Sequence, residues 1–287
     1  MLKIIKHGEI TEFIAARTLF RYPLYYNHFY YIDGLLIDTG PPHISREIIT
    51  ELEKLPLKKV AITHQHEDHT GTCRLIQENM GLPIYANLTT LEAMAAPPPI
   101  KIYRKVMWGN PEPVKGIPLD NYISTPKYRF EVIHTPGHSS DHVCFFESQN
   151  KWLFSGDLYL GENLTGFMEG ENIADHLNSL QTAIELEPKV LFCGLKGRLD
   201  DAAGRLIRKH NNWWELGSRV VQMYEAGASN NEILSTVMDG EVLFYRLSQH
   251  NWGRRHLLNS IIDNRELFKY KKNPLRDLSI INEDRAN

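Results

Sequence analysis

Residues 63–71 read THQHEDHTG and place three histidines and two carboxylates in nine positions, directly after the apolar run VAI at 60–62. Side chains two apart at the end of a strand point to the same side. His64 and His66 therefore form a chelating pair for a borderline metal ion such as zinc. Asp68 and His69 follow where we expect the loop to turn into a helix, and they can face a second ion about 3.5–4 Å from the first. The cluster predicts a metal centre.

Two later segments supply further candidate ligands. TPGHSSDH places His138 directly after an expected strand and a Pro-Gly turn, and LFSGDLYLG places Asp157 after another expected strand. A ligand in such a position is held rigidly. Because all of these candidates follow strands, one edge of the sheets would gather them into a single site.

The order of expected elements favours a layered α/β domain with mixed sheets. HFYYIDGLLIDTG reads as a hairpin turning at Asp33-Gly34, and residues 44–55 have helical spacing. The Pro- and Gly-rich segment 94–128 is expected to be an irregular lid or binding loop. Helices alone are expected from about residue 206, including one opened by Ser229 and Glu232 in capping-box spacing. We therefore expect a domain over 1–205 and a helical domain with a polar tail over 206–287.

These segments together resemble the metallo-β-lactamase fold superfamily of hydrolases, and NHFYYIDGLLIDTG resembles its opening hairpin. The resemblance implies an αββα sandwich with metals at one sheet edge, followed here by a small winged-helix-like helical domain. The chain matches the family's HxHxDH signature, its third-ligand histidine and its bridging aspartate. These positions are His64, His66, Asp68, His69, His138 and Asp157.

The resemblance also implies roles for these residues. His64, His66 and His138 would hold the first metal, and Asp68 and His69 the second, with Asp157 bridging both. Zinc held by three histidines lowers the pKa of its water to about 7. The resulting hydroxide would attack a carbonyl or phosphoryl centre, and Asp68 would orient the water or take its proton. A histidine at position 66, where the redox di-iron branch carries an acid, favours hydrolysis.

The final turn departs from the family pattern. Most of these hydrolases supply a last ligand from a GHG-like turn, but this chain reads VLFCGLKGRLDD, with Leu195 or Lys196 at that place. We therefore expect one firmly bound zinc and a weak or empty second site, with Mn or Fe as alternatives. Lys196 is a candidate catalytic residue that would anchor an anionic substrate, or it points into solvent. His210 or His256 would have to supply the missing ligand, although their spacing does not support that.

Several readings of the function stay open. The motifs look most like the β-lactamase-like protein 2 branch, some members of which cut RNA. The favoured function is hydrolysis of a small-molecule ester, thioester or lactone, because acyl chemistry needs only one metal. A nuclease or phosphodiesterase is the alternative, with Trp213 and Trp214 as stacking aromatics if they are not core residues. The third is a degenerate metal-binding protein with little catalysis.

Composition limits the locations and partners that we expect for the protein. The chain has 287 residues, and its net charge of −3 decides nothing about its partners; residues 196–287 are slightly basic, but too little to indicate a nucleic-acid partner. It lacks a secretory signal and a run of about 20 apolar residues, which disfavours a membrane location. Three well-separated cysteines, Cys73, Cys144 and Cys193, suggest reduced thiols in the cytoplasm. A homodimer through the helical appendage is left open.

Overall fold

The hairpin expected at Asp33-Gly34 is present in a computed structural model of the chain, which describes residues 1–20, 22–270 and 273–275. Strands β5 (Asn27–Ile32) and β6 (Leu35–Ile37) pair antiparallel, with Ile32 opposite Leu35. Asp33 and Gly34 have φ angles of 46° and 86°. A two-residue hairpin turn of this kind requires positive φ at both positions, which Asp-Gly tolerates.

The chain forms two compact units. The first contains residues 1–134, 141–157 and 189–200, and the second contains 135–140, 158–188 and 201–287. The expected domain boundary at residue 205 stays a prediction. The helix α7 (Ala202–Glu225) begins before that boundary.

Two sheets form the first unit. One has the strand order β1-β2-β5-β6-β7-β8-β9, antiparallel up to β6 and parallel from β6 to β9. Its remaining strands are β1 (Leu2–His7), β2 (Ile10–Ala15), β7 (Lys59–Ala61), β8 (Ile84–Ala86) and β9 (Ile117–Pro118). The other has the order β10-β11-β12-β13-β15-β16, in which only β13 and β15 pair in parallel. Its strands are β10 (Tyr122–Ser124), β11 (Arg129–His134), β12 (Val143–Glu147), β13 (Trp152–Gly156), β15 (Val190–Cys193) and β16 (Gly197–Asp200). A short hairpin, β3 (Thr18–Leu19) with β4 (Tyr22–Pro23), lies outside both sheets.

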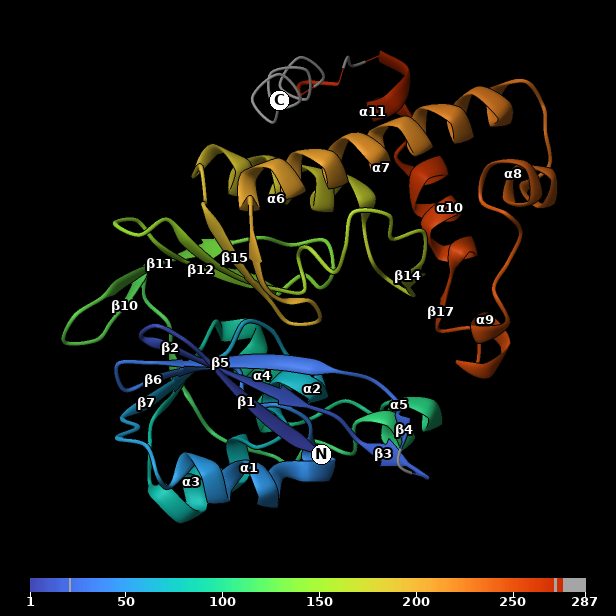
Figure 1. The fold of residues 1–287 in the computed structure, drawn as a ribbon. Helices are drawn as coiled ribbons and strands as arrows, with labels where there is room; N and C mark the ends of the chain where they lie inside the picture. The colour runs from blue at the N-terminus through green and yellow to red at the C-terminus, as the bar shows by residue number, and fades with distance from the viewer. Residues whose placement is uncertain (21, 271–272, 276–287) are drawn as a thin grey trace. The chain divides into compact units, whose positions relative to one another are not determined.

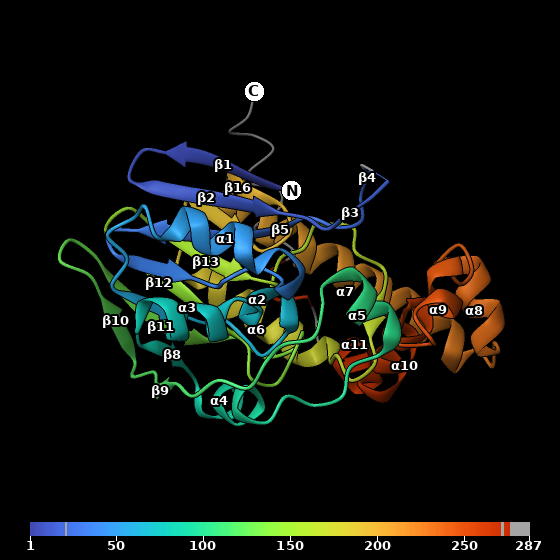
Figure 2. The same ribbon diagram turned by 90° about the horizontal axis from the view of Figure 1, so that it is seen from below.

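An apolar core joins the two sheets. Tyr30 of the first sheet packs edge-on against Phe154 and Phe192 of the second, at ring-centroid distances of 5.5 and 5.3 Å. The outer face of the first sheet carries α1 (Ser45–Leu52) and α3 (Cys73–Met80) (Figures 1 and 2). Ile48 of α1 and Ile76 of α3 are fully buried. Helix, sheet and sheet thus form successive layers, and the mixed α/β sandwich expected from the sequence is confirmed.

The segment 94–128 is more ordered than expected. It contains the end of α4 (Leu88–Ala95), the helix α5 (Ile102–Met107), and the strands β9 and β10. The segment is therefore not irregular throughout, because the prolines at 97–99 separate two helices, and its expected role as a lid or binding loop stays a prediction. Residues 102–107, IYRKVM, are free of glycine and proline and form the second helix.

The second unit is mainly helical, as expected for the C-terminal region. It contains α6 (Ile173–Glu185) alongside α7, followed by α8 (Asn230–Val237), α9 (Leu243–Leu247), α10 (Arg254–Asp263) and α11 (Arg265–Tyr270). Ser229 and Glu232 form the expected capping box. A strand was not expected here, but β17 (Trp252–Gly253) pairs with β14 (Phe167–Met168). The winged-helix likeness stays a prediction, and the expected polar tail lies outside the described residues from 276 onward.

The two tryptophans considered as RNA-stacking residues belong to the core of this unit. Trp213 and Trp214 are 2% and 7% exposed, and the indole N–H of Trp213 donates to the carbonyl of Leu164 at 2.6 Å. Their burial removes this support for RNA binding.

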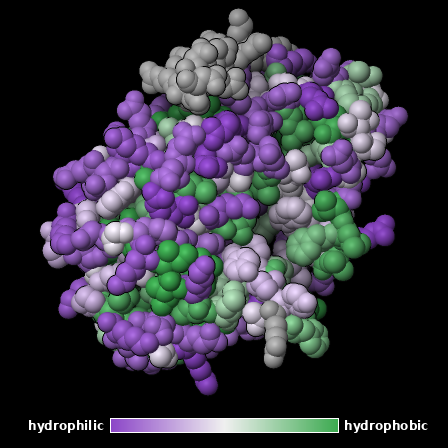
Figure 3. Space-filling view, viewed as in Figure 1, coloured by the Kyte–Doolittle hydropathy of each residue, from purple (hydrophilic) through white to green (hydrophobic). Residues whose placement is uncertain are grey.

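The surface is mostly hydrophilic in the view of Figure 3, with separate hydrophobic patches. Leu243 and Leu247 of α9 are 72% and 62% exposed. The homodimer suggested for the helical region stays a prediction. In the described part of the chain, no helix is both long and apolar enough to cross a membrane.

Candidate metal centre

The motif at 63–71 has the local structure that the sequence predicted. Strand β7 ends at Ala61, and the short helix α2 (Glu67–Thr70) begins directly after His66. His64 and His69 are completely buried, and Asp68 is 5% exposed. The turn from strand to helix therefore holds the histidines and the carboxylate inside the protein.

His69 is oriented by a buried carboxylate behind it. Its Nδ1 donates to Oδ2 of Asp38 at 2.7 Å, and Asp38 also accepts hydrogen bonds from the backbone N–H and the hydroxyl of Thr63. This leaves Nε2 of His69 facing Asp157 and Asp68. It lies 3.4 Å from Oδ1 of Asp157 and 3.7 Å from Oδ2 of Asp68.

These distances fit a shared divalent ion. Among the described residues, the buried Nε2 of His69 has no hydrogen-bond partner. Zinc binds imidazole nitrogen and carboxylate oxygen at about 2.0–2.2 Å with tetrahedral angles, so two of its ligand atoms lie roughly 3.4 Å apart. The spacing around His69 matches that value, and the donor set of imidazole and carboxylate suits a divalent metal.

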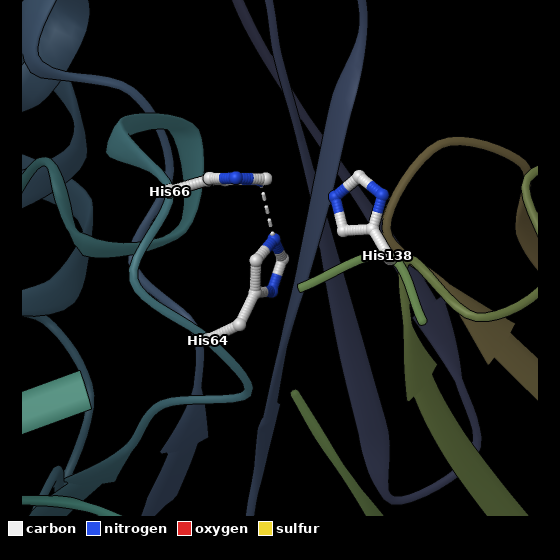
Figure 4. Close-up of side chains that lie close together, drawn as sticks. All are labelled: His64, His66 and His138. Atoms are coloured by element: carbon white, nitrogen blue, oxygen red, sulfur yellow. Dashed lines mark hydrogen bonds between the residues drawn. The ribbon is translucent and has the colours of Figure 1, made fainter. Parts of the chain in front are cut away.

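The structure brings predicted ligands of the first unit together. One ligand atom each from His64, His69 and Asp157 lies within 4.8 Å of the others. Nε2 of His64 and Nδ1 of His66 are 2.9 Å apart (Figure 4). His138 lies in the loop 135–140, which is joined covalently to β11 on one side and to Asp141, just before β12, on the other. The assignment of each residue as a ligand stays a prediction.

Burial and neighbouring charges shift the pKa values in this cluster. Burial, reinforced by the negative charge of Asp157, raises the pKa of Asp68 to about 6, and His69 opposes this shift. Burial alone would lower the pKa of His69, but Asp157, Asp38 and Asp68 together raise it well above its usual value. The carboxylates of the cluster therefore create a strongly negative local potential, which a bound cation would neutralise.

Two further residues support the ligands from behind. Nε2 of His142 accepts a hydrogen bond from the backbone N–H of Asp157 at 3.0 Å. Oδ2 of Asp141 accepts from the backbone N–H of Gln65 at 2.8 Å and from the hydroxyl of Thr90 at 2.7 Å. His142 thus fixes the start of the Asp157 turn, and Asp141 fixes the loop between His64 and His66.

The turn that lacks the family's last histidine is closely packed against the site. A Cβ added to Gly194 would lie 2.5 Å from Oδ1 of Asp157 and 3.0 Å from Cε1 of His69. The side chain of Lys196 is exposed, and its catalytic role stays a prediction.

The two histidines considered as replacement ligands have local contacts within the second unit. The ring of His210 stacks on Trp214, and Nε2 of His256 lies 2.6 Å from the carbonyl oxygen of His250.

Comparison with known proteins agrees with this geometry. The model of the metallo-beta-lactamase superfamily matches residues 27–195. The chain belongs to this superfamily.

Similar metallo-beta-lactamase superfamily proteins include named hydrolases. The chain is 23% identical to a beta-lactamase-like protein 2 homolog of Drosophila melanogaster over 69% of this chain and 66% of that protein. It is 27% identical to a hydroxyacylglutathione hydrolase of Bdellovibrio bacteriovorus, over 48% of this chain and 49% of that one. The matches thus span about half to two thirds of these relatives. A metallo-beta-lactamase family protein from Thermus thermophilus has the same fold, with a TM-score of 0.62 at 18% identity over 88% of this chain and 90% of that one.

Sequence reasoning missed one ion pair next to the superfamily motif. Arg104 of α5 forms a bidentate pair with Glu67, with both N–O distances at 2.7 Å and both side chains largely buried. Because 37 residues separate the partners, no local pattern signalled the pair.

Tyr25 was also missed as a neighbour of the metallo-beta-lactamase site. Burial, followed by the charges of Asp157 and Asp68, raises the pKa of its phenol well above 10.0. Its ring packs edge-on against Trp108, with the centroids 5.2 Å apart. The phenol of Tyr25 therefore stays neutral at ordinary pH.

Proposed function

We propose that this protein is a metal-dependent hydrolase of a small-molecule thioester, ester or lactone, with thioesters favoured. The observation that carries the proposal is the approach of His69 Nε2 to Asp157 and Asp68 at 3.4 and 3.7 Å. Three buried ligand atoms at this spacing form a candidate cation site.

The residues have separate tasks in this proposal. His64, His66 and His138 would hold the first ion, and Asp68 and His69 would hold the second, with Asp157 shared between them. A bound zinc ion, or manganese or iron in its place, would act as a Lewis acid and lower the pKa of water.

Asp68 and Tyr25 would handle protons and substrate. Burial raises the pKa of Asp68 to about 6, so its carboxylate is a stronger base than an exposed one and suits proton transfer near neutral pH. The phenol of Tyr25 would stay protonated, so it would be able to donate a hydrogen bond to a substrate.

Two considerations favour acyl chemistry over phosphodiester cleavage. Named relatives include a hydroxyacylglutathione hydrolase and an atrochrysone carboxyl ACP thioesterase of Aspergillus fumigatus, which is 29% identical over 52% of this chain and 44% of that protein. Acyl transfer also needs only one metal, whereas phosphodiester cleavage benefits from two. The buried thiols Cys73, Cys144 and Cys193 fit a reducing compartment, and we propose a cytoplasmic location.

A substrate panel tests the proposal. Metal-reconstituted protein is assayed with thioesters, esters, lactones, a phosphodiester and single-stranded RNA, beside the variants His64→Ala and His134→Ala. His134 is exposed at the end of β11 and serves as the matched control. We expect thioester turnover that His64→Ala lowers by at least about 100-fold and His134→Ala leaves unchanged.

Other outcomes would support one of the alternative functions. Faster cleavage of RNA or the phosphodiester than of every acyl substrate would establish the nuclease alternative. Metal binding without turnover of any substrate would favour the degenerate protein. The variant Lys196→Ala tests whether Lys196 anchors an anionic substrate. A rise in KM for anionic thioesters alone would support this role. The same change in kinetics for anionic and neutral substrates would rule it out.

A further inference from the structure

Glu171 is a buried carboxylate with a histidine on each oxygen. Its Oε2 lies 3.0 Å from Nε2 of His176, and its Oε1 lies 3.4 Å from Nδ1 of His138. The backbone N–H of Met168 also donates to Oε1 at 2.9 Å. The side chain of Glu171 is only 4% exposed, so its charge has to be stabilised by hydrogen-bond donors around it.

The loop that carries His138 is fixed against α6. The carbonyl of Gly137 accepts the backbone N–H of Asn172 at 3.0 Å, and the carbonyl of Pro136 accepts the hydroxyl of Ser179 at 2.7 Å. Gly137 has a φ of +135°, and a Cβ there would lie 2.6 Å from the backbone nitrogen and ring of His176. Only glycine allows this approach, so the loop and the helix form one rigid support.

His176 is held in turn by aromatic packing. Its ring lies 5.2 Å from that of Phe167 and 5.0 Å from that of Trp213, and it is 1% exposed. A ring enclosed in this way cannot turn away from Glu171. The position of the carboxylate is therefore set by the core of the second unit.

We propose that Glu171 is a positioning residue for His138, and that His176 holds Glu171 in place. The carboxylate would accept the Nδ1–H of His138, which fixes the tautomer and leaves Nε2 as the nitrogen that binds metal. Outer carboxylates of this kind orient metal-binding histidines and raise their basicity. The inference rests on the proposed role of His138 as a ligand, but it concerns metal affinity and tautomer and not the substrate.

The tautomer can be measured without a variant. Nitrogen-15 NMR of the metal-free, full-length protein near pH 7.5 should show the proton of His138 on Nδ1. A proton on Nε2 would overturn the proposal. Because this measurement requires neither metal nor substrate, it can fail while the hydrolase proposal stands, and the reverse also holds.

Metal affinity tests the energetic consequence. Zinc binding is measured by competition with a chromophoric chelator for the wild type, Glu171→Gln and the matched control Glu169→Gln, whose residue is exposed two positions earlier. We expect Glu171→Gln to weaken the tightest site by about 10–100-fold, with Glu169→Gln unchanged. Wild-type affinity in a folded Glu171→Gln protein would overturn the proposal.

Variants of His176 separate positioning from a merely structural role. His176→Gln keeps an N–H donor for Glu171 and should retain most of the zinc affinity, whereas His176→Phe removes the donor and should lose at least about 5-fold. Equal affinity of these two variants would contradict the proposed chain of contacts. His138, Glu171 and His176 also have ligand atoms within 4.8 Å of one another. Direct cadmium-113 coupling to His176 would make this trio itself a metal site and overturn the positioning role.

Discussion

His69 and Asp38 are joined by a buried hydrogen bond of 2.7 Å between Nδ1 and Oδ2. The bond decides which nitrogen of His69 faces Asp157 and Asp68, and Asp38 itself is fixed by Thr63 at the end of the strand that leads into the motif. The geometry of the candidate ligands thus depends on residues outside that set.

Replacing Asp38 by Asn should weaken metal binding without removing a ligand. The neutral amide holds the ring of His69 less firmly and lowers its basicity, so we expect zinc affinity to fall by about 10–100-fold. Chelator competition measures the change, and Asp120→Asn at an exposed carboxylate is the control. Affinity equal to the wild type would show that the Asp38 charge has no influence on the site.

Breaking the pair between Arg104 and Glu67 should destabilise the protein strongly. Arg104→Gln leaves the buried Glu67 charge without its bidentate partner, which should lower the free energy of unfolding by about 3–5 kcal/mol. Urea denaturation of the metal-free protein measures this loss. Arg74→Gln, which breaks the exposed pair with Glu78, should cost less than about 1 kcal/mol. Similar losses in the two variants would contradict a special role for the buried pair.

The stability of the protein should fall in mild acid partly because of His210. Burial lowers the pKa of this histidine from 6.5 to about 4. The unfolded chain therefore binds a proton between these values while the folded chain does not, and stability decreases as pH falls from about 6.5 to about 4, by roughly 1 kcal/mol per pH unit. Above pH 6.5 this contribution is constant.

A variant isolates the contribution of His210. His210→Phe keeps an aromatic ring against Trp214 and removes the titration, so its unfolding free energy should vary less between pH 6.5 and 4.5 than that of the wild type. His134→Ala, at an exposed histidine, should keep the wild-type slope. Identical slopes for the wild type and His210→Phe would refute this assignment. The measurements use metal-free protein so that release of metal in acid does not contribute, and the titration of the candidate ligands is common to all three proteins.

Zinc titration should reveal two unequal sites. With Gly194 packed against Asp157 where the family's last histidine is missing, the second ion has fewer ligands and should bind at least about 10-fold more weakly than the first. Gly194→Ala places a methyl group 2.5 Å from Oδ1 of Asp157 and should weaken the second ion further. Isothermal titration and metal analysis check this, and two ions held with equal affinity would contradict it.

Local patterns were sufficient to predict the motif, the opening hairpin and the capped helix. The turn at Asp33-Gly34 and the capping box of Ser229 depend on neighbouring residues, and the spacing of His64, His66, Asp68 and His69 is local as well. The pairs that support the site could not be predicted in this way. Arg104 contacts Glu67 across 37 residues of sequence. Glu171 contacts His138 although β12 and β13 lie between them in the sequence. Such contacts depend on how the strands and helices are stacked, which no local periodicity records.

The candidate ligands of the second ion arise from both sheets of the sandwich. His69 follows β7 of one sheet, and Asp157 follows β13 of the other. If the two layers slide or part by even an ångström, the chelate opens. Loss of the bound cation would then report separation of the two sheets before most of the secondary structure unfolds.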